Sequence, residues 1–137
     1  MNKEEKANKF FKLVEILEKL RGENGCPWDK KQTHKSLMKY LFEESNEYNQ
    51  AVEKQDYDNM KEELGDVLLQ VIFHAQIAKE NNKFDIYDVL DTINEKMIRR
   101  HPHVFGNSKA TTEEEIRAEW EKIKAEEKKR KHGGIEG

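Results

Sequence analysis

The stretch MKEELGDVLLQVIFHAQI, residues 60–77, carries apolar side chains on most sides of the helix that it predicts. They recur at the three- and four-residue spacing of a helix and are Met60, Leu64, Val67, Leu68, Val71, Phe73 and Ile77. A helix that is apolar on most sides is usually surrounded by other elements. We therefore expect a helix over about residues 59–80 to lie at the centre of the fold.

The segments on both sides of this central helix also have apolar stripes at helical spacing. They predict helices over about residues 4–20, 33–54, 85–100 and 112–127, separated by loops with glycine or proline near residues 22–27 and 102–106. No segment alternates apolar and polar residues long enough to indicate a strand. The prediction is an all-α fold: an antiparallel bundle of about five helices in one domain, residues 1–127, with a solvated tail, residues 128–137.

Composition limits the classes of function that fit. Of the 137 residues, 39% are charged and 35% hydrophobic, which favours thin helices or an oligomer that completes its core between chains. The net charge of -3 gives no long-range attraction to a nucleic-acid polymer or an anionic membrane. With Cys26 as the single cysteine, and neither an apolar leader nor a membrane-spanning segment, a cytoplasmic location is expected.

Two pairs of acidic residues interrupt the apolar faces of neighbouring predicted helices. Glu44 with Glu47, and Glu63 with Asp66, are each three residues apart, so their Cβ atoms lie roughly 5–6 Å apart on one face. A short connection makes the two helices antiparallel neighbours, which brings the four carboxylates together. Desolvation and mutual repulsion would oppose their ionisation. A hard cation removes that cost, so we expect Mg²⁺, with Mn²⁺ as a substitute.

Other interpretations of the acidic pairs remain open at this point. Acidic pairs at this spacing are common on solvated helix faces. A di-iron centre is a competing metal site, but it requires Glu-x-x-His on two helices, and no histidine lies three residues after a glutamate. Gly65 costs about 1 kcal/mol relative to alanine inside a helix, which indicates a packing or ligand-binding reason for it.

Three basic residues, Lys96, Arg99 and Arg100, gather at the end of the predicted helix 85–100. Arg100 lies close to the apolar stripe, Lys96 at its margin, and Arg99 further out. The arginine fork suits phosphate, and the alternative is an ion pair with an inward carboxylate. Beside a metal site, phosphate binding is the better interpretation. Lys61 could also reach a phosphate, and Trp28 and Trp120 could stack on a base or belong to the core.

The acidic residues also resemble a known family signature. EESNE, residues 43–47, followed by ELGD, residues 63–66, resembles the E-E-x-x-E…E-x-x-D signature of MazG-type nucleoside triphosphate pyrophosphohydrolases. The resemblance covers roughly residues 10–127 and includes GCPWDKKQTHKSL, RRHPHVFG and EEIRAEWEKIKAEEK. The acidic signature alone would also fit related all-α nucleotide pyrophosphatases, including dimeric dUTPases.

The resemblance implies an all-α fold that assembles as a homodimer or a dimer of dimers, and Mg²⁺-dependent hydrolysis of NTPs to NMP and pyrophosphate. It implies that Glu44, Glu47, Glu63 and Asp66 bind the metal. It also implies a nucleotide site lined by residues 40–44 and 59–62, which include Tyr40, Lys61 and Glu62, with phosphate contacts from Lys96, Arg99 and Arg100 and with Trp120 near the nucleotide. Some members have two such domains, and this sequence resembles the half that begins with CPWD.

These observations give one hypothesis and one alternative. The hypothesis is an Mg²⁺-dependent NTP and dNTP pyrophosphohydrolase that removes unwanted nucleotides, with Glu43 or Glu47 as general base and Trp28 as a base-stacking residue. The alternative is a nucleotide- or metal-binding regulatory module, or a dimerisation module, without significant turnover. That class would be expected to lack some of the four metal ligands, and all four are present.

Overall fold

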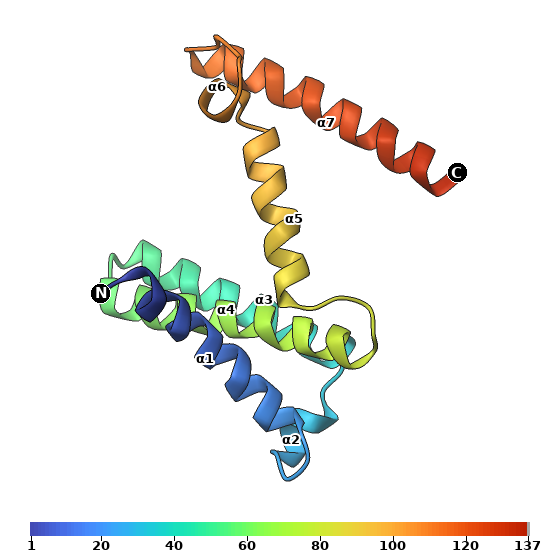
Figure 1. Cartoon of the computed structure of the whole chain (residues 1–137). Helices are drawn as coiled ribbons and strands as arrows, with labels where there is room; N and C mark the ends of the chain where they lie inside the picture. Colours follow the sequence, from blue (N-terminus) through green and yellow to red (C-terminus); the bar gives the residue numbers. More distant parts are fainter. Residues whose placement is uncertain (137) are drawn as a thin grey trace. The chain divides into compact units, whose positions relative to one another are not determined.

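The structure, a computed structural model, describes residues 1–136 and the side chains of residues 1–131 (Figure 1). Its helices are α1 (Lys3–Arg21), α2 (Pro27–Lys31), α3 (His34–Glu53), α4 (Tyr57–Glu80), α5 (Ile86–Arg99), α6 (Pro102–Phe105) and α7 (Glu113–Glu136). No strand occurs among these described residues, so the all-α prediction is confirmed.

The starts of α3 and α4 follow from capping side chains. Thr33 Oγ1 accepts a hydrogen bond from the Ser36 amide, and Ser36 Oγ accepts one from the Thr33 amide, which forms a capping box. Asp56 caps α4 by accepting a hydrogen bond from the Asn59 amide. As a result α4 begins at Tyr57, slightly before the residue expected from the apolar pattern.

The central position of α4 is confirmed within the first of two compact units, Met1–Ile86. Both α1 and α3 pack against α4, and α3 and α4 lie side by side as antiparallel neighbours joined by residues 54–56 (Figure 1). The buried apolar side chains of these three helices are Val14, Leu17, Leu37, Ala51, Ile72, Phe73, Ala75, Ile77 and Ala78. The carboxyl-terminal half of α4 therefore provides most of the core.

The amino-terminal half of α4 is less covered. Leu64, Leu68 and Val71, which we call the α4 stripe, are 49%, 41% and 39% exposed and lie on one face at helical spacing. A Cβ added to Gly65 would meet no atom within 4 Å, so the described chain offers no close helix contact that requires this glycine. The α4 stripe is thus an apolar surface that the other helices of the first unit leave open.

The second compact unit begins at Tyr87 and contains most of α5 together with α6 and α7. The short helices α2 and α6 lie in segments that were expected to be loops, and both have proline in the first turn. Helix α7 starts after Thr112, as predicted, but continues through Glu136 instead of ending near residue 127. The division into a domain and a tail stays a prediction. None of the described helices combines the length and apolar character needed to cross a membrane.

Candidate functional site

Three acidic side chains from the adjacent helices α3 and α4 converge. Carboxylate oxygens of Glu44, Glu63 and Asp66 all lie within 4.8 Å of one another, and the three side chains are half-buried. One oxygen of Glu44 and one of Glu63 are buried without a hydrogen-bond partner. Buried polar atoms normally have a partner, so these two oxygens mark a place where a cation or a donor fits. We call these three residues the carboxylate cluster.

Glu47 borders the carboxylate cluster from its more exposed side. Its carboxylate interacts with those of both Glu44 and Glu63. Burial, followed by the charges of Asp66, Glu47 and Glu63, raises the pKa of Glu44 to about 7. Burial and the Glu47 contact also raise the pKa of Glu63. The repulsion expected from the sequence is therefore present, and a divalent cation would relieve it.

The remaining acidic and basic residues expected on these helices lie outside the carboxylate cluster. Glu43, Lys61 and Glu62 are all exposed, and none of them belongs to the group of converging oxygens. Glu43 and Glu47 were equal alternatives for a general base on sequence alone. Only Glu47 contacts carboxylates of the cluster.

Tyr40, one turn before Glu44 on α3, forms an aromatic pair with Trp28 of α2. The ring of Tyr40 meets the ring of Trp28 edge to face, with centroids 5.7 Å apart and planes at 70°. Lys39 Nζ lies 5.0 Å from the centroid of the Tyr40 ring. Trp28 is 49% exposed, so it is not a core residue and presents much of its ring to solvent. The structure thus brings together Trp28 of α2 and Tyr40 of α3, and Tyr40 lies one helical turn before Glu44.

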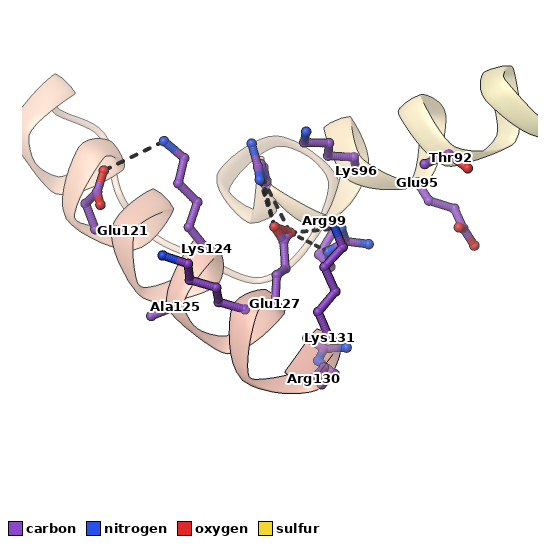
Figure 2. Close-up of a pocket in the computed structure, with 12 residues that line it drawn as sticks. Thr92, Glu95, Lys96, Arg99, Glu121, Lys124, Ala125, Glu127, Arg130 and Lys131 are labelled. Atoms are coloured by element: carbon purple, nitrogen blue, oxygen red, sulfur yellow. Dashed lines mark hydrogen bonds and ion pairs between the residues drawn. The ribbon is translucent and has the colours of Figure 1, made fainter. Parts of the chain in front are cut away.

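The basic residues of α5 have a partner that the sequence did not reveal. Figure 2 shows Glu127 of α7 reaching the end of α5. One of its oxygens lies 2.8 Å from Arg99 Nη2, and the other lies 2.8 Å from Arg100 Nη2. The hydrogen bonds from Arg100 and Arg99 lower the pKa of Glu127 to about 2. The ion-pair alternative therefore has a structural counterpart within the second unit, with Glu127 of α7 as the partner.

A groove of about 890 Å³ runs along this ion-pair network in the second unit. Basic side chains outnumber acidic ones in its lining, which contains Lys96, Arg99, Arg100, Lys124, Lys128, Arg130, Lys131, Glu95, Glu121 and Glu127 (Figure 2). Because one Glu127 carboxylate serves two guanidinium groups, positive charge remains at this end of α5. Such a surface can bind an anion.

Trp120 lies in the same unit, against the α6 segment. Its ring packs edge to face on His101 with centroids 5.5 Å apart, and its indole Nε1 is buried without a hydrogen-bond partner. The side chain is half-buried. Trp120 is therefore partly a packing residue, as the alternative interpretation held, and it keeps one unused donor.

Comparisons with known proteins identify the family of the chain. Residues 32–105 match the family model described as the MazG nucleotide pyrophosphohydrolase domain, and this range contains the carboxylate cluster and all of α3, α4 and α5. The chain is similar in fold to a crystal structure of a mazG-related protein from Thermotoga maritima, with a TM-score of 0.70 and 31% sequence identity over 83% of this chain and 97% of that one.

Curated relatives are similar in sequence over most of the chain. It is 57% identical over 122 residues to the nucleoside triphosphate pyrophosphohydrolase/pyrophosphatase MazG of Thermotoga maritima, covering 89% of this chain and 46% of that protein. It is 46% identical over 125 residues to the nucleoside triphosphate pyrophosphohydrolase of Escherichia coli, covering 90% and 48%. The chain thus spans less than half the length of these two relatives.

Proposed function

The chain belongs to the MazG nucleotide pyrophosphohydrolase family, and on this premise we propose that it hydrolyses nucleoside triphosphates to monophosphates and pyrophosphate with Mg²⁺. The observation that carries the proposal is the carboxylate cluster. Its orphaned oxygens on Glu44 and Glu63 and the raised pKa of Glu44 fit a cation-binding site. Removal of unwanted nucleotides in the cytoplasm is the role that we propose for this activity.

The donors of the carboxylate cluster fit a hard cation. Glu44, Glu63 and Asp66 offer oxygen atoms within 4.8 Å of one another, and Glu47 lies against two of these residues. Mg²⁺ takes such oxygens and keeps several waters, and Mn²⁺ accepts the same ligands. When bound, the metal supplies charge neutralisation at the triphosphate and activation of a water molecule.

Glu47 is our choice for general base over Glu43. The reaction forms a bond between a water oxygen and the α-phosphorus and breaks the bond from that phosphorus to the bridging oxygen of the departing pyrophosphate. A proton must leave the attacking water, and Glu47 can accept it because it borders the cluster while remaining in contact with solvent. Glu43 is exposed and makes no contact with the cluster that would place it for this step.

The nucleoside and phosphate groups would be bound by the other residues of the site. Trp28 and Tyr40 form an aromatic corner one helical turn from Glu44, which suits stacking of a base. Lys61 on α4 offers positive charge to the triphosphate. The second unit, taken by itself, offers Lys96, Arg99 and Arg100 as cations that suit phosphate, and the unused indole donor of Trp120.

The direct test measures pyrophosphate release from a panel of canonical NTPs and dNTPs. We expect hydrolysis with Mg²⁺ or Mn²⁺ and none after chelation, because the four carboxylates repel a bare triphosphate. Equimolar NMP and pyrophosphate in the product, without free phosphate, would identify the bond that breaks. A folded protein that hydrolyses no nucleotide in the panel contradicts the proposed function.

A second part of the proposal is a homodimer through the α4 stripe. Exposed Leu64, Leu68 and Val71 support it because contiguous apolar surface of this kind is usually covered in the working protein. We expect light scattering to give twice the 16.3 kDa mass of one chain, and Leu68→Glu to give a single-chain mass. Ile16→Glu, at a similarly exposed position on α1, serves as the control and should remain dimeric. A single-chain mass for the unaltered protein would mean that something else covers the stripe.

A further inference from the structure

Arg21, the last residue of α1, is a buried hub between three helices. Its Nε and Nη2 atoms donate to the two carboxylate oxygens of Glu80 on α4 at 2.9 and 3.0 Å. Its Nη1 atom donates to the carbonyl oxygens of Asp29 and Gln32 at the end of α2. The guanidinium also lies 5.6 Å from the centroid of the Phe73 ring, and the side chain is 7% exposed.

The short helix α2 depends on these contacts. With five residues it is far below the length at which a helix is stable alone, so tertiary interactions must hold it. Its terminal carbonyl groups have no partners further along the helix. Arg21 supplies both hydrogen-bond donors and a positive charge at that end, where the helix dipole favours a cation.

The orientation of α2 decides where Trp28 lies. Trp28 is the second residue of α2, and its carbonyl oxygen accepts a hydrogen bond from Gln32 Nε2 at 3.0 Å. Gln32 Oε1 in turn accepts one from Ser36 Oγ, in the capping box of α3, at 2.7 Å. A continuous set of contacts therefore connects Glu80 and Arg21 to the backbone of Trp28, whose ring faces Tyr40.

We propose that Arg21, clamped by Glu80, is a positioning residue that holds Trp28 in place to stack on the base of the nucleotide. This inference rests on the proposed function, because it assigns Arg21 to the base end of the same site. Arg21 itself is too buried to touch the nucleotide and acts through α2. Its planar fork matters, since a lysine cannot donate at once to both Glu80 oxygens and to both carbonyls.

The alternative is that Arg21 serves only as a structural link between α1 and α4, and the chain offers a control for this alternative. Glu18 and Lys79 join the same two helices through an exposed ion pair of 3.5 Å that does not contact α2. Glu18→Gln therefore weakens the link between α1 and α4 without loosening Trp28. A purely structural role predicts a loss of stability from both changes, larger for the buried Arg21, without a specific rise in KM, whereas the positioning role predicts a rise in KM from the Arg21 change alone.

The experiment compares Arg21→Lys, Glu80→Gln and Glu18→Gln in the full chain, with two measurements. The first is the KM and kcat of pyrophosphate release. We expect Arg21→Lys to raise KM at least about fivefold, as expected for weakened stacking on a base, with little change in kcat. Glu80→Gln should give a smaller rise, and Glu18→Gln should match the unaltered protein.

The second measurement is acrylamide quenching of Trp28 fluorescence in a Trp120→Phe background, with and without a non-hydrolysable nucleotide and Mg²⁺. Without nucleotide, we expect acrylamide to quench Trp28 more strongly in Arg21→Lys than in the protein that keeps Arg21. We also expect the nucleotide to protect Trp28 less in Arg21→Lys. An unchanged KM with unchanged quenching overturns the inference, and so does an equal effect of Glu18→Gln. If the unaltered protein hydrolyses nothing, the proposed function fails. Nucleotide protection of Trp28 then decides the inference alone, and equal protection with and without Arg21 overturns it.

Discussion

Replacing Glu44 by glutamine should abolish Mg²⁺-dependent pyrophosphate release and at the same time stabilise the metal-free protein. Glutamine keeps the size of the side chain but removes the charge that a cation would bind. Because loss of residues that merely orient metal ligands costs about 10–100-fold, we expect loss of a ligand to lower kcat/KM by more than about 100-fold. The loss should be the same for every nucleotide that the unaltered protein hydrolyses.

The stability gain follows from the raised pKa of Glu44, about 7 against an ordinary value of 4.5. The unfolded chain releases this proton near pH 4.5, whereas the folded protein keeps it until about pH 7. Stability of the metal-free protein therefore falls as the pH rises from 4.5 through 7, and at pH 8 the full cost is present. A neutral glutamine avoids that cost, so the Tm of Glu44→Gln at pH 8 should exceed that of the unaltered protein by a few degrees.

Thermal unfolding with and without Mg²⁺ separates the two effects of Glu44→Gln. Mg²⁺ should raise the Tm of the unaltered protein, because it binds only the folded state, and should leave Glu44→Gln unchanged. The control is Glu53→Gln, which removes one charge at the end of the same helix and should retain activity and the response to Mg²⁺. Activity in Glu44→Gln equal to that of the unaltered protein would refute the assignment of the carboxylate cluster.

The sequence predicted those features of the fold and site that depend on helical periodicity. The central helix and the meeting of Glu44, Glu63 and Asp66 follow from side chains three or four residues apart on long helices. Because the rise and rotation per residue of a helix are fixed, the spacing of residues in the sequence determines which side chains share a face. Inference from periodicity is therefore strongest for the first unit.

The features that the sequence did not predict depend on contacts between distant residues. Helix α2 is too short to show a period, and it forms because Arg21, eight residues before Asp29, caps its end. Glu127 lies in a helix that is rich in charged residues, and nothing in the sequence distinguishes it from its neighbour Glu126. Only the packing of α7 on α5 brings it to Arg99 and Arg100. Pro27 and Pro102 at the first turns of α2 and α6 were the available signals for the short helices.

Replacing Glu127 by glutamine should release α7 from the end of α5. The change leaves two guanidinium groups, Arg99 and Arg100, side by side without their shared anion. The Glu127 side chain is 16% exposed and that of Arg99 is 40% exposed, so the loss should lie between those of exposed and fully buried pairs, about 1–3 kcal/mol. Hydrogen exchange should show faster exchange at pH 7 in α7 and in the last turn of α5, with α3 and α4 unchanged.

The effect of Glu127→Gln should also depend on pH in a defined direction. The pKa of Glu127 is lowered from 4.5 to about 2 by the two arginines, so its ion pairs contribute their full stability above about pH 4.5. That contribution falls as the pH drops from 4.5 through 2, and the Tm difference between the variant and the unaltered protein should shrink over this range. Glu126→Gln, the exposed neighbouring change, is the control and should show no such difference. If both variants behave alike at pH 7, the ion pairs of Glu127 do not hold α7 at the end of α5.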